Sequence, residues 1–303
     1  MTRFFITICV LSSLCLAVAC GEPASEPIEL DEENQNTEEP REPRDYDGPI
    51  GGDRPVTAEF PDDYDVEGNH PLLIQLHGFG SNAFQTRAFF ETGAEARARG
   101  VVILTPEGTT NNDGEQFWNA TEMCCDWGNS GVDDVAYLTG LIEEAVEKYA
   151  VDPERVFFMG LSNGGFMSHR MACERGDLVR GIVSFNGASF NDAQACDPDH
   201  PVEIIHIHAT DDDIVPYDGH NWLPSAQEVV ERWVDWNECD PEAVMEGRID
   251  LAYNIEGDET VIESWQNCVD GGAVQFWTME GAPHVPYPLN DFGPTIFDVL
   301  LAD

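Results

Sequence analysis

The sequence contains six short apolar runs that each end in glycine or in a polar turn, and this pattern constrains the fold more than any other feature. The runs are PLLIQLHGFG, VVILTPEG, VFFMGLSNGG, GIVSFNG, VEIIHIHATDDD and VQFWTMEGAPH. Continuous runs rich in Val and Ile are typical of strands buried on both faces, as in a parallel sheet. Helical patterns lie between them, and the clearest has the apolar stripe Val135, Leu138, Ile142, Val146 and Tyr149. The alternation predicts an α/β domain with a mostly parallel, doubly wound sheet and flanking helices.

The charge balance of the chain excludes two classes of partner. The 303 residues contain 58 Asp and Glu against 14 Lys and Arg, so the formal net charge is -44. A surface of this sign repels nucleic acid and anionic lipid, and we expect neither as a partner. An acidic surface stays hydrated in salt, which leads to the hypothesis that the protein works in salt water.

The first 19 residues have the pattern of a secretory signal peptide. Arg3 provides a positive start, and the apolar stretch over 4–17 is too short to span a bilayer comfortably. Cys20 follows a small-residue cleavage site and resembles the lipidated cysteine of bacterial lipoproteins, although Leu16 lies four residues before it instead of the usual three. Lipidation of Cys20 would anchor the protein to the cell envelope, at the outer membrane or the surface. Ordinary cleavage at the same bond would release an extracellular protein.

The composition changes at about residue 55. Residues 20–55 are rich in Glu, Asp, Pro and Gly and contain few apolar side chains, so they cannot bury enough surface to fold. We predict a disordered acidic linker over this range, which begins at the anchoring cysteine. The remaining residues, 56–303, are predicted to form the α/β domain.

Cysteine usage agrees with export. An even number of cysteines beyond residue 20 predicts three disulfides in an exported chain, and the six are Cys124, Cys125, Cys173, Cys196, Cys239 and Cys268. The last two are a natural pair late in the chain. The adjacent Cys124 and Cys125 could pair separately with the remaining two, and the sequence does not decide which with which. No CxxC pair or nearby histidine supports a metal site, so we predict no metal and no other cofactor.

The stretch RVFFMGLSNGGFMSHRM, residues 155–171, predicts a catalytic nucleophile. Its apolar run predicts a buried strand, which ends in a glycine-flanked turn over 160–165 and continues into a helical pattern. A strand-to-helix turn of the form G-x-S-x-G raises a serine hydroxyl at the carboxyl edge of a sheet, where active residues lie in such folds. We therefore predict that Ser162 is a nucleophile.

A nucleophilic serine needs a histidine base, and chain order restricts the choice. In this kind of fold the order is serine, acid, histidine, and only His220 and His284 come late enough. If His220 were the base, one short loop would have to supply both the base and the acid. His284 follows the last strand in a loop with glycine and proline, and we predict it as the base.

The acid is expected in HATDDDIVPY, directly after a predicted strand. Asp211, Asp212 and Asp213 all compete there, and the spacing alone does not choose between them. The preceding His206 and His208 are expected within or at the end of the strand, as packed or hydrogen-bonded residues.

Acyl transfer also needs donors for the negative oxygen of the tetrahedral intermediate. The residue after the nucleophile, Asn163, offers its backbone N–H. The second donor is expected from the loop QLHGFGSN, where His77 and Gly78 allow the backbone to turn and Phe79 presents its N–H.

With these residues in place, the chain resembles a known family. The similarity runs from about Pro71 to Pro288 and is to polyhydroxybutyrate depolymerase-like and feruloyl esterase-like bacterial enzymes, carbohydrate esterases of the α/β-hydrolase superfamily. Its most specific block has a WNA segment, paired cysteines, a VDDV helix start and VDP-x-RV before the serine turn. LLIQLHGFGSN resembles the family's oxyanion strand and loop, and MEGAPHVPYP its histidine segment.

The resemblance implies an α/β-hydrolase fold and a carboxylic ester hydrolase with a Ser-His-Asp triad. HATDDDIVPY is similar to the family pattern H-G-T-x-D-x-x-V-P-Y, and the matching register puts the acid on Asp212. Two departures stand out. Ala209 replaces the usual glycine, and Tyr287 stands near the usual tryptophan, so the substrate-facing rim is expected to differ.

Three functions are weighed from the sequence. The first is an esterase for feruloyl- or acetyl-type esters of plant or algal polysaccharide, with Trp118, Tyr217 and Trp222 as candidate substrate contacts beside Trp127. Core packing is the alternative role of each aromatic residue. The second is a depolymerase for polyhydroxybutyrate or 3-hydroxybutyrate oligomers, although no separate polymer-binding domain is visible. The third is a non-catalytic tethered binding protein, against which the complete Ser, Asp and His set argues.

Overall fold

The computed structural model describes residues 48–289 and 291–302. The predicted signal peptide, the lipidated Cys20 and most of the predicted linker lie outside this part of the chain. None of the helices in the described part is both long enough and apolar enough to cross a bilayer.

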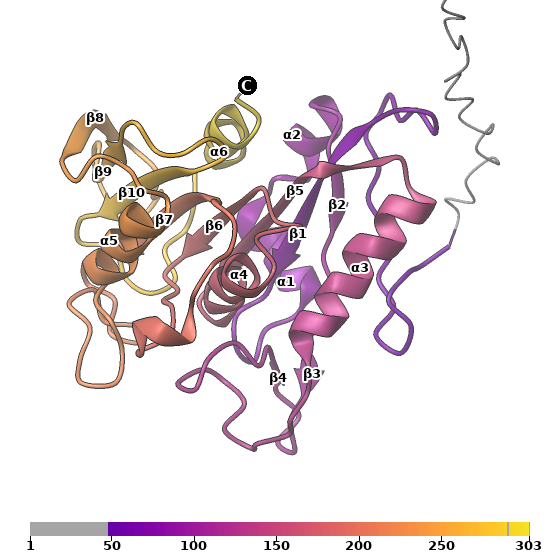
Figure 1. The fold of residues 1–303 in the computed structure, drawn as a ribbon, viewed down its shortest axis with the longest axis horizontal. Helices are drawn as coiled ribbons and strands as arrows, with labels where there is room; N and C mark the ends of the chain where they lie inside the picture. Colours follow the sequence, from indigo (N-terminus) through magenta and orange to yellow (C-terminus); the bar gives the residue numbers. More distant parts are fainter. Residues whose placement is uncertain (1–47, 290, 303) are drawn as a thin grey trace, which may run out of the picture. The chain divides into compact units, whose positions relative to one another are not determined.

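A mixed sheet of eight strands forms the centre of the fold, in the order β2-β1-β5-β6-β7-β10-β9-β8 (Figure 1). The first six strands in this order are parallel, and β9 and β8 pair antiparallel at one edge. The bounds are β1 His70–Leu76, β2 Val102–Leu104, β5 Val151–Leu161, β6 Gly181–Phe185, β7 Glu203–Ala209, β8 Ala243–Ile249, β9 Thr260–Trp265 and β10 Ala273–Met279. The predicted doubly wound, mostly parallel sheet is confirmed.

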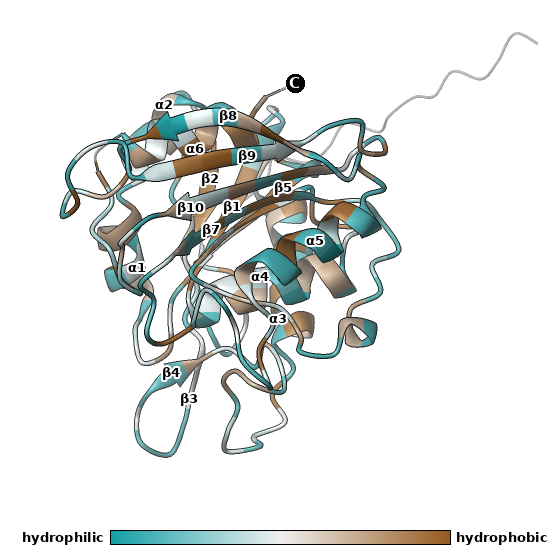
Figure 2. Ribbon diagram, turned by 90° about the vertical axis from the view of Figure 1, so that its left-hand side faces the viewer, coloured by the Kyte–Doolittle hydropathy of each residue, from teal (hydrophilic) through white to brown (hydrophobic). Residues whose placement is uncertain are grey.

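Helices cover both faces of this sheet. Figure 2 shows α3, α4 and α5 on one side and α2 and α6 on the other. The bounds are α1 Ala83–Phe90, α2 Gly93–Ala98, α3 Asp134–Lys148, α4 Asn163–Glu174, α5 Ala226–Trp236 and α6 Phe292–Leu300, with a 3-10 turn at Ala193–Ala195 and a small hairpin of β3 Thr109–Thr110 and β4 Gln116–Phe117. Alternate residues of β1 serve the two faces, because Leu72 packs in the core under α3 to α5 and Leu73 in the core under α2 and α6.

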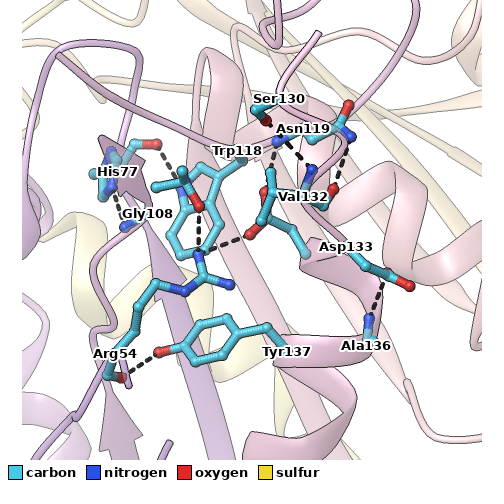
Figure 3. Close-up of polar contacts among 12 residues, drawn as sticks. Arg54, His77, Gly108, Trp118, Asn119, Ser130, Val132, Asp133, Ala136 and Tyr137 are labelled. Atoms are coloured by element: carbon cyan, nitrogen blue, oxygen red, sulfur yellow. Dashed lines mark hydrogen bonds and ion pairs between the residues drawn. The ribbon is translucent and has the colours of Figure 1, made fainter. Parts of the chain in front are cut away.

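The predicted helix over the VDDV segment is α3. Its N-cap is Asp133, whose side chain accepts the Ala136 N–H at 2.9 Å (Figure 3). Val135, Leu138 and Ile142 of the predicted stripe are buried against the sheet. The apolar period therefore gave both the type of this element and its buried face.

The boundary of the predicted linker needs correction, because residues 48–55 pack on the domain. Ile50 pairs with Val56 and is only 2% exposed. The Arg54 guanidinium lies 3.5 Å from the ring centroid of Tyr137 and forms an ion pair with the buried Asp134 at 2.7 Å (Figure 3). One isolated apolar residue in an acidic, proline-rich stretch gave too little pattern to predict this contact.

The three disulfides agree with the predicted number. The expectation that Cys124 and Cys125 pair separately with Cys173 and Cys196 is wrong. Cys239 pairs with Cys268 as expected. Cys173, at the end of α4, pairs with Cys196, so the neighbouring Cys124 and Cys125 pair with each other. Tertiary structure brings Cys173 and Cys196 to a Cα–Cα distance of 5.2 Å, which sequence spacing does not reveal.

The Cys239–Cys268 bond closes a loop whose ends are 29 positions apart in the sequence. Replacing both residues by alanine is expected to lower the free energy of unfolding by about 3.5 kcal/mol, because the unfolded chain regains the entropy of the open loop. Urea unfolding of the oxidised protein measures this. Cys239→Ala alone breaks the same bond and should cost nearly as much. An unchanged unfolding midpoint in both variants would contradict the prediction.

Candidate active site

Ser162 lies at the turn between β5 and α4, in a backbone conformation that few residues adopt. Its φ is 54° and its ψ is -120°, the strained geometry of a nucleophile turn. The flanking glycines make this turn possible. A Cβ at Gly160 would lie 2.1 Å from the Gly164 carbonyl carbon, and a Cβ at Gly164 would lie 2.2 Å from the Leu76 oxygen. The G-x-S-x-G pattern is therefore a packing requirement between β5, α4 and β1.

His284 and Asp212 form a short, buried hydrogen bond. His284 Nδ1 lies 2.7 Å from Asp212 Oδ2, and the Asp212 side chain has no exposed surface. The other carboxylate oxygen, Oδ1, accepts the N–H groups of Ile214 and Val215 at 2.9 and 2.8 Å. Because these two donors fix the carboxylate, Oδ2 is aimed at the histidine. The Nδ1 proton of His284 then points to Asp212, and Nε2 is left free to accept a proton.

The two competing aspartates have different surroundings. Asp211 and Asp213 are both exposed, and the Asp211 carboxylate accepts only the Thr210 hydroxyl among the described residues, at 3.3 Å. His220, the competing histidine, lines the same cavity as Ser162 and His284 but has no hydrogen bond to an aspartate among the described residues. The structure thus brings together Ser162, His284 and Asp212 and leaves the two rival aspartates in solvent.

Ser162 and His284 line one cavity of about 320 Å³. Its other walls are mostly apolar, and they are Phe79, Met123, Cys124, Cys125, Trp127, Phe166, Ile214, Val215, His220 and Leu223. The Phe79 and Trp127 rings pack at a centroid distance of 4.9 Å. A pocket of this size with an apolar wall and a few polar groups at one end suits a small organic acyl group.

His77 fixes the peptide that would provide one oxyanion donor. The Gly108 N–H donates to His77 Nε2 at 2.9 Å (Figure 3), so Nδ1 must carry the ring proton and donate to the Gly78 carbonyl at 2.8 Å. That carbonyl and the Phe79 N–H belong to the same peptide group, so the N–H is directed the opposite way. Desolvation by burial lowers the pKa of His77, which keeps the ring neutral and this pattern intact.

Asn163, the second predicted oxyanion residue, is also held by its side chain. Its amide oxygen accepts the Trp118 N–H at 2.7 Å, and its amide nitrogen donates to the Trp118 carbonyl at 2.9 Å. The Trp118 indole donates in turn to the His77 carbonyl at 3.1 Å (Figure 3). Within the described residues, no hydrogen bond engages the backbone N–H of Phe79 or Asn163.

The predicted aromatic contacts lie in different places. Trp118 has no exposed surface, so its predicted substrate contact is corrected to a supporting role beneath the site. Tyr217 stacks on Phe276, and its hydroxyl lies 3.2 Å from Thr278 Oγ1, outside the cavity wall. Trp222 is 61% exposed and also lies outside this wall, whereas Trp127 is part of it.

One residue of the site was missed by the sequence analysis. Asn186 follows β6, and its side chain donates to the His284 carbonyl at 2.7 Å and accepts the Ala209 N–H at 2.7 Å. It therefore ties the base loop to the end of β7. The sequence does contain a pattern that could have identified Asn186: a polar residue that directly follows a buried apolar run, here GIVSF. The same kind of pattern identified Ser162. The Cys124–Cys125 disulfide in the cavity wall was also not foreseen.

The fold and the site define an α/β-hydrolase: a mostly parallel sheet with a serine turn after β5, an acid after β7 and a histidine after β10. The sequence profile of the Phospholipase/Carboxylesterase family matches residues 65–234, more than half of the chain, and the chain belongs to this family. The resemblance inferred from the motifs is thereby confirmed at the level of the family.

Individual relatives agree with this assignment. The chain is 27% identical over 243 residues to Feruloyl esterase B of Piromyces equi, covering 76% of this chain and 42% of that protein. It is 29% identical over 197 residues to Probable feruloyl esterase C of Aspergillus niger, covering 63% and 64%. The chain thus spans less than two thirds of either relative. A solved acetyl xylan esterase from Aspergillus awamori matches 85% of this chain and 97% of its own at a TM-score of 0.60 and 13% identity, a likeness of fold.

His77→Leu is expected to lower kcat for a short aryl ester by about 10²- to 10³-fold, with a smaller change in KM. Leucine cannot hold the Gly78 carbonyl, so the Phe79 N–H of the same peptide would no longer be directed at the oxyanion of the transition state. Steady-state kinetics measure this. His70→Leu is the matched control, since His70 is the first residue of β1, the strand that ends just before His77, its Nδ1 bonds the Gly100 carbonyl at 2.9 Å, and it does not line the cavity. Equal kinetics in the two variants would rule out the positioning role of His77.

Asn186→Asp should lower kcat by about tenfold to hundredfold, because the carboxylate keeps the acceptor for Ala209 and loses the donor to His284. Kinetics on the same ester, with thermal unfolding to confirm the fold, measure the effect. Asn191→Asp, at an exposed position, should change neither. Full activity in Asn186→Asp would show that this bond does not hold the base in place.

Proposed function

We propose that this protein is a serine esterase that hydrolyses carboxylic esters through Ser162, His284 and Asp212. The observation that carries this proposal is the 2.7 Å bond between His284 and Asp212 at the wall of the cavity that Ser162 also lines. The feruloyl esterases to which the chain is similar support an ester as the substrate.

In the first half of the reaction, Ser162 Oγ attacks the ester carbonyl carbon and its proton passes to His284 Nε2. Asp212 holds the imidazole in the required tautomer and stabilises the imidazolium. The carbonyl oxygen becomes negative and accepts the N–H groups of Phe79 and Asn163. When the intermediate collapses, the C–O bond to the alcohol breaks, His284 returns the proton to the departing oxygen, and the acyl group stays on Ser162.

In the second half, water replaces the alcohol. His284 Nε2 removes a proton from the water, whose oxygen attacks the acyl carbon, and the same two N–H groups stabilise the negative oxygen. The bond to Ser162 Oγ breaks as His284 returns the proton, which releases the carboxylic acid and restores the enzyme. No metal or cofactor takes part in these steps.

We propose feruloyl- or acetyl-type esters of plant or algal polysaccharide as substrates. Feruloyl esterases are among the relatives, and the Phe79 and Trp127 rings give the cavity an aromatic wall on which a phenolic ring can pack. The polysaccharide would remain outside the cavity, at the exposed rim. Export with an N-terminal lipid anchor at Cys20, or release after cleavage before it, belongs to the same proposal and rests on the sequence alone.

The decisive test compares hydrolysis of methyl ferulate with that of 3-hydroxybutyrate oligomers, using the protein produced with its native leader and Ser162→Ala as control. We expect a preference for methyl ferulate. Ser162→Ala should lose roughly 10⁶-fold in kcat and keep its circular dichroism spectrum, because alanine removes only the hydroxyl.

A preference for the oligomers would replace the polysaccharide substrate by a storage polyester and leave the mechanism in place. Turnover by Ser162→Ala would overturn the assignment of the nucleophile. Activity of the wild-type protein on neither ester, nor on a general aryl ester, would favour a tethered binding protein.

A further inference from the structure

Three buried histidines form a hydrogen-bonded row behind the acid loop, and the proposed reaction makes no use of them. His169 lies on α4, the helix that begins after the nucleophile, and His206 and His208 lie on β7. His169 Nε2 is 3.1 Å from His206 Nδ1, and His206 Nε2 is 3.2 Å from His208 Nδ1. All three side chains are buried. We call these residues the histidine array.

The groups at the two ends of the histidine array can act in one way only. At one end the Trp233 indole N–H of α5 donates to His169 Nδ1 at 3.0 Å. At the other end His208 Nε2 lies 2.8 Å from the Val215 carbonyl oxygen. An indole N–H can only donate a hydrogen bond, and a carbonyl oxygen can only accept one.

These end groups determine the position of every ring proton. Because His169 Nδ1 accepts from Trp233, the proton of His169 is on Nε2 and is donated to His206 Nδ1. The same reasoning puts the proton of His206 on Nε2 and directs it to His208 Nδ1. His208 then carries its proton on Nε2 and donates it to Val215. The histidine array is satisfied by one arrangement of protons, and that arrangement is the same from both ends.

The histidine array is also neutral. Burial lowers the pKa of His169 to about 3 and lowers the pKa values of His206 and His208. Its neighbours are aromatic: His206 lies 5.8 Å from the Phe276 ring and His208 lies 5.8 Å from Tyr217. A further proton on any ring would set two N–H groups against each other.

We propose that the histidine array positions the catalytic acid, with His208 as the positioning residue. This inference rests on the proposed function, in which Asp212 is the acid. His208 Nε2 bonds the Val215 carbonyl and lies 3.7 Å from Asp212 Oδ2. The N–H of the same Val215 bonds Asp212 Oδ1. The loop from Asp212 to Val215 is thus held from behind while its carboxylate faces His284.

The direction of the array matters at its last ring. In the reversed arrangement, His208 would carry its proton on Nδ1 and present the Nε2 lone pair to a carbonyl oxygen and a carboxylate. Both contacts would be repulsive, and the acid loop would move. Trp233 on α5 supports the same direction from the far end of the histidine array, because its indole N–H stabilises the arrangement in which His208 donates to Val215.

Two substitutions of His208 separate the two ring nitrogens. The amide nitrogen of His208→Gln reaches the place of Nε2 and can donate to Val215, so kcat should fall by about threefold. The amide of His208→Asn reaches only the place of Nδ1, so kcat should fall by about 10²-fold with KM nearly unchanged, the cost of a misplaced catalytic group. His200→Asn, at an exposed histidine, is the control and should match the wild type. Equal losses in the Gln and Asn variants would overturn the proposal.

The remote end is tested by Trp233→Phe in two backgrounds. In the wild-type background, loss of the indole N–H should lower kcat by about tenfold. In the His208→Gln background the side-chain amide donates to Val215 whatever the position of the protons on His169 and His206. Trp233→Phe should therefore lower kcat less than about twofold in that background. A purely structural role of Trp233 would give equal losses in both backgrounds, or a loss of stability without a loss of kcat, and either result would overturn the proposal.

If a variant fails to fold, nitrogen NMR of histidine-labelled wild-type protein tests the array directly. The three histidines of the array should carry their proton on Nε2 and stay neutral at the ordinary pKa of histidine, about pH 6.5. An Nδ1-protonated form of any of them, or an ordinary or raised pKa, would refute the array. Ser162→Ala separates the two proposals: if it stays active, the proposed function fails, whereas if it is inactive and the His208 variants behave alike, only the array fails.

Discussion

The close approach of β5, α4 and β1 is the constraint on which the rest of the site depends. Gly160 and Gly164 leave no space for a side chain, so the turn that carries Ser162 lies against the end of β1. The loop after β1 contains Phe79, and the same approach brings the neighbouring Gly78 close to Ser162. His77 and Asn163 then stabilise this arrangement through Gly108 and Trp118. The close backbone packing therefore places the Gly78–Phe79 peptide, which His77 holds, beside the turn that carries Ser162.

The sequence predicted the features that depend on local pattern and chain order. The sheet followed from apolar runs that alternate with helical periods, and Ser162 and His284 followed from their places after predicted strands. Local chemistry left three aspartates open, and only the family register selected Asp212. In the structure, Asp212 alone of the three is buried, receives the N–H groups of Ile214 and Val215 and bonds His284, which agrees with that prediction.

The features that the sequence did not predict depend on tertiary neighbours. The sequence around Trp118 does not distinguish a buried tryptophan from an exposed one. In the structure Trp118 is buried under the site, and the Asn163 side chain bonds its backbone. Cys124 pairs with Cys125 because the fold places Cys173 beside Cys196, on a segment distant in the sequence. His206 and His208 were expected to be packed or hydrogen-bonded, and they are, but their partner His169 comes from another element. Long-range contacts of this kind leave no period in the sequence.

The surface of the molecule carries many acidic side chains, whereas the one carboxylate of the site is buried and bonded to uncharged backbone N–H groups and a histidine. The chain has a net charge of -44, yet among the described residues the ion pairs of Asp212 are to histidines and to no Lys or Arg. Its carboxylate instead accepts the backbone N–H groups of Ile214 and Val215 and bonds His284 Nδ1. Salt weakens interactions between exposed charges far more than those between buried groups. The ionic strength around an acidic surface can therefore vary with little effect on the Asp212 carboxylate, because its side chain has no exposed surface and its partners are two backbone N–H groups and a histidine.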